Sequence, residues 1–446
     1  IFNLDRQPVS DAKLEDMAIA MKSRGPNGIG LVSRDMFGLV HCALHTTPQS
    51  LEEKQPVTDN ESGILLAADA RLDNRDDLVN KLGIPGKERN TLPDSTLILL
   101  AYRKWGEGCF EKFVGDFAVI IWDARKRKLL SARDAIGVKQ LFVHKSGNQL
   151  LVATTIGAIL AALPHPPGLN ERFLKQLLRD QYHLWRNETV YQGIFPVGSG
   201  GILVAGETIE QKSFISLDPP PKLHYQDDDE YLEHFRELFL EVVTANARST
   251  TPVGIQVSGG IDSSGVAAAL KHLDELSGPP AQNRYLYSVV TDTFPRMDER
   301  EYLESLAERC KPWPVHTLLG EESWPLRRDR GGELSPRDQP WTGLLWTSAR
   351  DLALMAKNDG CRVILTGNGG DELALSNPYR YPQLMFGLPA KDLAKEWKHF
   401  VRNARSGSTL SLFASAVSGY VRTNYSPAIL NRLKKVRDSF VKPREN

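Results

Sequence analysis

Two glycine-rich segments in the second half of the chain carry residues suited to nucleotide chemistry. The first, QVSGGIDSSGVAAAL, spans 256–270 and leads from an apolar run into an alanine-rich helical pattern. A strand, a glycine-rich turn and a helix N-terminus form an anion site, because backbone N–H groups and the positive helix end face the ligand. The lysine of the common GxxxxGK[ST] phosphate loop is missing. This loop must therefore bind phosphate through other groups.

The residues of the loop indicate which groups these are. Gly259 and Gly260 allow the backbone to approach a ligand closely, and Ser258 and Ser263 offer hydroxyl donors. Asp262 would repel a phosphate unless a cation lay between them. Oxygen ligands and phosphate together favour Mg²⁺. The loop therefore predicts a site for a magnesium-bound nucleotide.

The second segment, LTGNGGDELAL, follows the apolar strand pattern RVIL. Ligands bind at the carboxyl ends of the strands in open α/β sheets, so this segment is expected at the ligand-binding edge. Asp371, which follows Gly369 and Gly370, could then reach the same cation as Asp262. Two ordinary turns are the alternative. The occurrence of both segments in one domain favours a shared nucleotide site.

The surrounding patterns predict two domains of different construction. Residues 1–215 read as short apolar or alternating runs, which predict stacked β-sheets with packed helices in an α+β domain. Helical spacing covers 94–105, with Asp94 as N-cap and Gly106 as the stop, and also 171–185. Residues 216–446 alternate strands and helices, which predicts a doubly wound parallel α/β sheet.

A proline-rich and aspartate-rich connector, SLDPPPKLHYQDDDEYL, separates the two patterns. Three consecutive prolines make a stiff spacer, and we place the domain boundary there, between residues 215 and 216. We interpret the three aspartates that follow as a helix N-terminus, where negative charge suits the helix dipole.

The bulk composition excludes several classes of protein. Of the 446 residues 41% are hydrophobic, and 55 basic residues balance 55 acidic ones. Zero net charge argues against a dedicated nucleic-acid or membrane-surface protein. The four cysteines lack zinc or disulfide spacing, and no apolar run has the length of a membrane span. We therefore expect reduced thiols and a cytoplasmic location. Because no methionine precedes Ile1, we also expect that N-terminal residues are missing.

The segment from Ser258 to Ser263 resembles the SGGxDS signature of the N-type ATP pyrophosphatases. That family cleaves ATP between the α and β phosphates, and its loop holds the departing pyrophosphate. AMP is transferred to a carboxylate, which is thereby activated toward an amine. The resemblance explains the missing lysine, because no γ-phosphate is transferred.

The same resemblance implies roles for individual residues. Ser258, Gly259, Gly260 and Ser263 would hold the β and γ phosphates, and Asp262 and Asp371 would bind Mg²⁺. Val289 would contact the adenine. In the second segment, Gly367 would bind the nucleotide and Asn368 would join the two aspartates as a catalytic residue.

The whole chain resembles the asparagine synthetase superfamily, whose first domain is a class II, N-terminal nucleophile glutaminase. MKSRGPNGIG, EKQPV and VYQGIFPVGSGGILV are similar to family segments in the same order. Two glutamine-binding segments differ. The arginine expected after His41 falls near Ala43, and ADARLDN at 68–74 replaces NGEIYN. Asp94 survives, but the nucleophilic cysteine would precede Ile1. We therefore expect the first domain to be an inactive glutaminase.

If glutamine supplies no ammonia, the amine must come from elsewhere, as in two cyclising branches of the superfamily. GNGGDELALSNPYRYP, with Gly370 before Asp371 and Pro378 further on, looks most like the lasso peptide cyclases. This branch implies a precursor peptide as substrate, together with a leader peptidase and a leader-recognition protein. β-Lactam synthetases and asparagine synthetases remain alternatives; the latter carry a glutamate at the position of Asn368. A non-catalytic scaffold in a peptide-maturation complex is an alternative of another class.

Three further features stay open at the level of sequence. Asp298 and Glu299 resemble an acidic pair of the cyclising branches, but a helix N-terminus explains them equally well. Residues 325–338 could form a lid over the nucleotide or a solvated loop. The superfamily continues with a helical segment that carries a lysine near the α-phosphate, so we expect the chain to be incomplete at its C-terminus.

Overall fold

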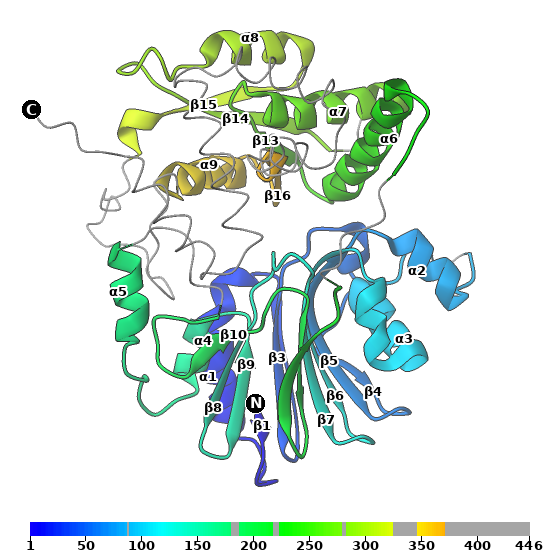
Figure 1. The fold of residues 1–446 in the computed structure, drawn as a ribbon, viewed down its shortest axis with the longest axis vertical. Coiled ribbons are helices and arrows are strands. Elements are labelled where there is room, and N and C mark those ends of the chain that lie inside the picture. Colours follow the sequence, from blue (N-terminus) through cyan, green and yellow to red (C-terminus); the bar gives the residue numbers. More distant parts are fainter. Residues whose placement is uncertain (87–88, 180–186, 217–222, 279–281, 324–345, 371–446) are drawn as a thin grey trace, which may run out of the picture. The chain divides into compact units, whose positions relative to one another are not determined.

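The computed structural model describes residues 1–86, 89–179, 187–216, 223–278, 282–323 and 346–370. Residues 1–367 form one compact unit, and residues 368–446 form a second. Within the first unit, antiparallel sheets precede a parallel sheet along the chain (Figure 1). The two predicted types of construction are therefore both present. The predicted boundary between residues 215 and 216 stays a prediction.

The first part contains two antiparallel sheets. One has the order β10-β8-β9-β1-β3-β2 and the other the order β12-β11-β7-β6-β5-β4. The strands of the first are β10 Ile194–Pro196, β8 Phe142–Ser146, β9 Gln149–Ala153, β1 Phe2–Asn3, β3 Phe37–Ala43 and β2 Gly28–Arg34. Those of the second are β12 Ile209–Ser213, β11 Gly201–Ala205, β7 Lys128–Arg133, β6 Gly115–Asp123, β5 Ile64–Leu72 and β4 Val57–Asp59.

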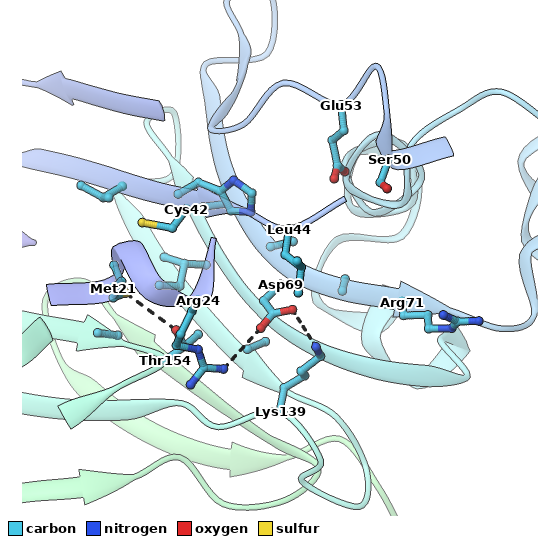
Figure 2. Close-up of a pocket in the computed structure, with 18 of the residues that line it drawn as sticks. Met21, Arg24, Cys42, Leu44, Ser50, Glu53, Asp69, Arg71, Lys139 and Thr154 are labelled. Atoms are coloured by element: carbon cyan, nitrogen blue, oxygen red, sulfur yellow. Dashed lines mark hydrogen bonds and ion pairs between the residues drawn. The ribbon is translucent and has the colours of Figure 1, made fainter. Parts of the chain in front are cut away.

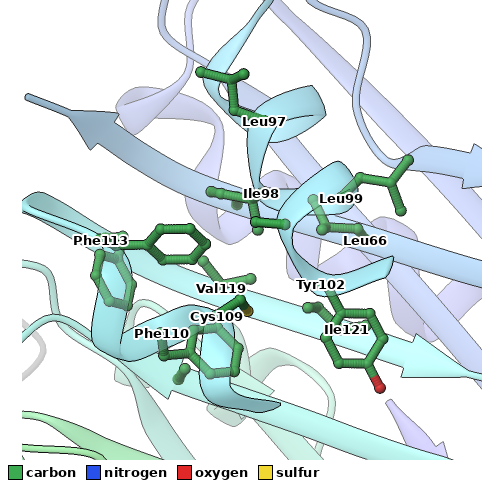
Figure 3. Packing of buried hydrophobic residues seen from close by; sticks show 14 of the residues in the cluster. Leu66, Leu97, Ile98, Leu99, Tyr102, Cys109, Phe110, Phe113, Val119 and Ile121 are labelled. Atoms are coloured by element: carbon green, nitrogen blue, oxygen red, sulfur yellow. The ribbon is translucent and has the colours of Figure 1, made fainter. Parts of the chain in front are cut away.

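Alternation along β5 divides its side chains between two cores. Leu65 and Ala67 face the other sheet, whereas Leu66 and Ala68 pack with the helices α2 (Arg75–Leu82) and α3 (Asp94–Trp105). Figure 3 shows this second core, in which α3 lies over β5 and β6. Helices α1 (Asp11–Met21) and α4 (Ile156–Ala161) cover the first sheet. This arrangement confirms the predicted stacked sheets with packed helices.

Helix α3 departs from the prediction at its first turn. Pro93, not Asp94, is the N-cap, and Asp94 is the first helical residue. The Asp94 carboxylate does not cap the helix because it accepts a hydrogen bond from the backbone N–H of Leu72 instead (3.0 Å). The expected stop is confirmed, since Gly106 is the C-cap with φ +59°.

The second part contains a parallel sheet of order β15-β14-β13-β16. Its strands are β13 Val253–Gln256, β14 Arg284–Val290, β15 Val315–Leu319 and β16 Val363–Leu365. Helices α6 (Asp228–Ala247), α7 (Ile261–Ser277) and α8 (Arg300–Arg309) share one core with this sheet. Helix α9 (Trp346–Asn358) packs on the opposite face, through Leu352 and Ala356 against Tyr287. Helices on both faces confirm the doubly wound prediction (Figure 1).

Two local predictions near the connector can be compared with the structure. Asp227 accepts a hydrogen bond from the Glu230 N–H (3.0 Å), and Asp228 and Asp229 lie in the first turn of α6. The aspartates therefore form a helix N-terminus, as interpreted. Helix α5 covers Glu171–Arg179, and the remainder of the helix predicted to residue 185 lies outside the described residues. In the part of the chain that the structure describes, no helix is long and apolar enough to cross a bilayer.

Candidate active site

The loop between β13 and α7 is held in shape by its own hydroxyl groups. The Ser258 N–H donates to Ser263 Oγ (3.1 Å), and the two serine hydroxyls lie 3.2 Å apart. The Gly260 N–H points back to Ser258 Oγ (3.3 Å). Gly260 is the N-cap of α7, so the helix begins at the loop as predicted. The loop thus presents a helix N-terminus with hydroxyl groups, which is an anion site by construction.

Gly259 is required by both its conformation and its surroundings. Its φ of +87° lies in the left-handed region that favours glycine. A β-carbon there would lie 2.9 Å from the Tyr302 β-carbon and 3.2 Å from the Glu299 carbonyl oxygen. The start of α8 therefore packs directly against this loop. A side chain at position 259 would push α8 away from the loop.

The second predicted segment reaches the loop at Gly367. A β-carbon at this position would lie 2.6 Å from the Ser263 backbone nitrogen and 2.9 Å from its α-carbon. The parallel register pairs Ile255 with Leu365, which carries the chain after β16 to the start of α7. Gly367 and Ser263 are therefore brought together, as a shared site requires.

Asp262 lies in the first turn of α7 and is partly exposed. Among the described residues, no side chain forms a hydrogen bond or ion pair with its carboxylate, and no group of three or more His, Cys, Asp or Glu gathers there. Mg²⁺ often uses one or two carboxylates and completes its coordination with phosphate and water. A free carboxylate beside an anion-binding helix end fits that use.

The other predicted ligand cannot be placed. Asp371 lies outside the described residues, and so does Pro378. Asn368 is the first residue of the second unit of the chain. Their predicted roles stay predictions.

Val289 lies on β14 close to the loop. Because the parallel register pairs Gln256 with Tyr287, Val289 lies on β14 at the level of Ser258. Val289 is 39% exposed although β14 is an inner strand, because it lies near the carboxyl end of that strand. An adenine ring packed on it would bury this surface. The position therefore suits the predicted adenine contact.

Glu321 is a residue of this edge that the sequence reasoning missed. It follows β15, and its Oε1 accepts hydrogen bonds from the Thr291 hydroxyl (2.6 Å), the Asp292 N–H (2.8 Å) and the Thr293 N–H (2.6 Å). The hydrogen bonds from Thr291 and Thr293 lower the pKa of Glu321 to about 2. Glu321 thereby fixes the loop after β14. Its carboxylate accepts from backbone N–H groups of that loop that could otherwise bind an anion. No local pattern signals this contact, because the residues belong to separate strand ends.

The acidic pair near α8 has structural partners. Asp298 accepts a long hydrogen bond from the Thr291 N–H (3.5 Å) and lies 3.4 Å from the guanidinium of Arg300. Glu299 is the N-cap residue of α8 and makes no side-chain capping bond. Residues 325–338, the predicted lid or loop, lie outside the described residues.

A cavity of about 1240 Å³ is lined by the predicted glutamine-binding segments of the first domain and by residues of the second part such as Cys361 and Arg362. Figure 2 shows Asp69 between Lys139 and Arg24 on its wall. The Asp69 carboxylate lies 2.8 Å from Lys139 Nζ and 3.9 Å from Arg24 Nη2. His41 also lines the cavity, and burial lowers its pKa, so its imidazole is neutral at pH 7. The cavity is present, but the Asp69 carboxylate on its wall is already paired with Lys139 and Arg24.

Asp94 lines the same cavity, and its carboxylate has more partners than that of Asp69. Its side chain is 9% exposed. The Arg75 guanidinium donates to Oδ1, and Arg248 Nη2 lies 3.7 Å from Oδ2, which also accepts the Leu72 N–H. Two guanidinium groups thus neutralise the one acidic residue that survives from the glutaminase pattern. A ligand ammonium group would have to displace them.

Two protein-family models match successive parts of the chain. A glutamine amidotransferase domain model matches residues 1–215, and an asparagine synthase model matches residues 234–440. Together with relatives named asparagine synthetases, these matches establish the family. The chain belongs to the asparagine synthetase superfamily.

Three curated relatives align with most of the chain. The amidase chyE of Penicillium rubens is 28% identical over 380 residues, which cover 81% of this chain and 54% of that protein. The amidase chry2 of Gibberella zeae is 28% identical over 394 residues, with coverages of 83% and 56%. A putative glutamine-hydrolysing asparagine synthetase 2 of Methanocaldococcus jannaschii is 24% identical over 384 residues, with coverages of 81% and 72%. The chain spans about half the length of the two amidases.

Proposed function

We propose that this protein is an AMP-forming amide ligase whose acceptor amine does not come from glutamine hydrolysis in the first domain. The observation that carries the proposal is a contrast between two sites. The Ser258–Ser264 loop presents the N-terminus of α7, and its Asp262 carboxylate has no partner among the described residues. In the first domain, Ala43 stands at the expected arginine position, and Asp94 is already paired with Arg75 and Arg248.

The reaction has two balanced steps. A substrate carboxylate oxygen attacks the α-phosphorus of ATP, the α–β bridging bond breaks, and pyrophosphate leaves. An amine then attacks the acyl carbon, loses a proton, and displaces AMP as an amide forms. Ser258, Gly260 and Ser263 would hold the departing pyrophosphate, and Val289 would contact the adenine. Asp262, with Asp371, would hold Mg²⁺, which neutralises phosphate charge when bound.

In its more specific form, the proposal is a lasso peptide cyclase. The carboxylate then belongs to an Asp or Glu side chain of a precursor peptide, and the attacking amine is the freed N-terminus of the same peptide. Holding both groups within one folded peptide would supply much of the rate acceleration. A leader peptidase and a leader-recognition protein would act with it in the cytoplasm.

Incubation with ATP, Mg²⁺ and a linear core peptide tests this form. The product should be lighter than the peptide by one water, and AMP should accumulate with pyrophosphate. Release of ADP would overturn the AMP-forming mechanism itself. Peptide-dependent exchange of labelled pyrophosphate into ATP is expected for an enzyme and excludes a non-catalytic scaffold.

A second candidate is favoured by the names of the relatives, which include amidases and glutamine-hydrolysing asparagine synthetases. Here the acceptor would be ammonia, and the product would be a primary amide of a small carboxylic acid; a β-lactam synthetase-like ring closure is the third form. Two measurements separate the candidates: amide formation from free ammonia, and incorporation of ¹⁵N from glutamine labelled at its amide nitrogen. Incorporation of glutamine nitrogen would refute our reading of the first domain.

A further inference from the structure

Two segments of the first domain, 41–47 and 68–74, differ from the glutamine-binding pattern, and both contact the second part of the same compact unit. Segment 68–74 reaches the end of helix α6. Segment 41–47 reaches the chain just before β13 and β16. Residues of both segments therefore connect the two parts of this unit.

Arg71 caps the end of α6. Its Nη2 lies 2.5 Å from the Ala245 carbonyl oxygen, 2.8 Å from that of Asn246 and 3.1 Å from that of Arg248. The last carbonyls of a helix have no partner within the helix and form the negative end of its dipole. A guanidinium at this position satisfies both needs. The Arg71 side chain is 15% exposed, so the contact is shielded from water.

Arg248 makes the reciprocal contact, from the end of α6 to β5. It follows α6 directly, and its Nη2 donates to the Leu72 carbonyl oxygen (3.0 Å) and lies 3.7 Å from Asp94. The two arginines therefore cross between β5 and α6, each bonding to the backbone of the opposite element. Reciprocal bonding of this kind fixes the distance between the two elements.

A second pair of contacts lies at the amino edge of the parallel sheet. The Thr250 N–H donates to the Thr46 carbonyl oxygen (2.9 Å) shortly before β13. Arg362, immediately before β16, donates from Nη1 to the His45 carbonyl oxygen (2.9 Å) and to Asn27 Oδ1 (2.6 Å). Both strands that carry the nucleotide loops at their carboxyl ends are thus held at their amino ends.

We propose that segments 41–47 and 68–74 form a clamp that positions the nucleotide loop, with Arg71 as its main positioning residue. The path is short: α6 packs on α7, with Phe239 of α6 3.9 Å from where a β-carbon on Gly265 of α7 would lie. Helix α7 carries the loop serines and Asp262 in its first turn. Loss of the cap on α6 would let α6, α7 and β13 shift together.

This inference rests on ATP binding at the Ser258–Ser264 loop, which is part of the proposed function, but not on the acceptor amine. Its first readout is therefore independent of chemistry. In the full chain, Arg71→Met should speed hydrogen exchange of peptides covering 240–257 at least tenfold, while peptides of β6 and β7 keep their rates. Mg-ATP should bind at least fivefold more weakly, with the rate of pyrophosphate exchange at saturating ATP nearly unchanged.

Two further variants make the result specific. Arg71→Lys should restore most of the affinity, because an ammonium can also donate to the three carbonyls. Arg34→Met removes an exposed arginine whose guanidinium donates to Asn60 Oδ1, far from α6 in sequence, and should change neither readout. If Arg71→Met does not fold, Arg362→Gln tests the second pair of contacts in the same way.

The outcomes separate this proposal from the proposed function. Wild-type hydrogen exchange at 240–257 in Arg71→Met overturns the clamp, whether or not ATP binds. Faster exchange throughout the first domain, without rescue by lysine, shows a purely structural role and also overturns it. Wild-type protein that does not bind Mg-ATP would refute the proposed function, while the hydrogen-exchange comparison would still test the clamp.

Discussion

Asp94 and Asp262 both lie in the first turn of a helix, yet their surroundings are opposite. Asp94 begins α3, is nearly buried, and is paired with the guanidiniums of Arg75 and Arg248. Asp262 lies at the start of α7, is partly exposed, and has no partner among the described residues. The charge of Asp262 is therefore available to a ligand, whereas that of Asp94 is neutralised by the chain itself.

The same contrast extends to a second carboxylate of the cavity. Asp69 and Asp94 both line it, and lysine and arginine side chains pair with their charges. For the buried Asp94 such pairing is required, because burying a charge is costly unless it is paired. The local charge balance, more than the presence of a cavity, distinguishes the two sites.

The largest effect is expected for Asp262→Ala. Loss of the metal-binding carboxylate should lower the rate of ATP–pyrophosphate exchange about 10³-fold, in the range found when one group that stabilises the transition state is removed. The free energy of unfolding should change by less than about 1 kcal/mol, because a partly exposed first-turn aspartate contributes little more than its dipole interaction. Exchange kinetics and urea denaturation of the same preparation measure both.

Asp229→Ala is the matched control. Asp229 is an exposed aspartate in the first turn of α6, so its removal changes the same charge at the same kind of position. Its exchange rate should match that of the wild type. An equal loss in both variants would mean that Asp262 acts through general charge and not through a bound cation.

Asp94→Asn should show the reverse pattern. It leaves the buried guanidinium of Arg75 and the partly buried one of Arg248 without their counter-charge. Breaking a buried pair from one side typically costs about 3–5 kcal/mol. The free energy of unfolding, measured by urea denaturation, should fall by roughly 3 kcal/mol. Pyrophosphate exchange at saturating ATP should fall much less than in Asp262→Ala. A stable variant with lost activity would place Asp94 in a working site and reverse the comparison.

Gly367→Ala tests whether the two loops meet. The new β-carbon would lie 2.6 Å from the Ser263 backbone nitrogen, so one loop must move. The KM for ATP should rise about tenfold, which corresponds to roughly 1.4 kcal/mol of binding free energy. In Gly265→Ala, the nearest atom lies 3.9 Å away, and the helix should gain up to about 1 kcal/mol. Equal KM values in the two variants would contradict the close approach.

The sequence could predict those features that depend on neighbouring residues. The loop at Ser258, the helix from Asp228 and the alternation of strands and helices all follow from local patterns, and the structure confirms them. Asp94 shows the limit. Aspartate is a common N-cap, so local rules predicted a cap, whereas its actual partners are the Leu72 N–H and two arginines from elsewhere in the chain.

Arg71 illustrates the same limit from the other side. Its departure from the family pattern was visible in ADARLDN, which signalled a loss of glutamine binding. Nothing local indicated what it gained, because the carbonyls it contacts belong to the end of α6. A substitution reveals a lost contact in sequence, but the replacing contact requires the fold.

The smallest effect is expected for Glu321→Gln, and it should depend on pH. Hydrogen bonds from Thr291 and Thr293 lower the folded-state pKa of Glu321 to about 2, below its ordinary value of 4.5. A lowered carboxyl pKa stabilises the folded state above the ordinary value, and this stability is lost as the pH falls through 4.5 toward 2. The wild type should therefore melt at a slightly higher temperature than Glu321→Gln above about pH 5, and the difference should shrink toward pH 2. A Tm difference that stays constant from pH 7 to pH 3 would mean that Glu321 holds the loop by shape and not by charge.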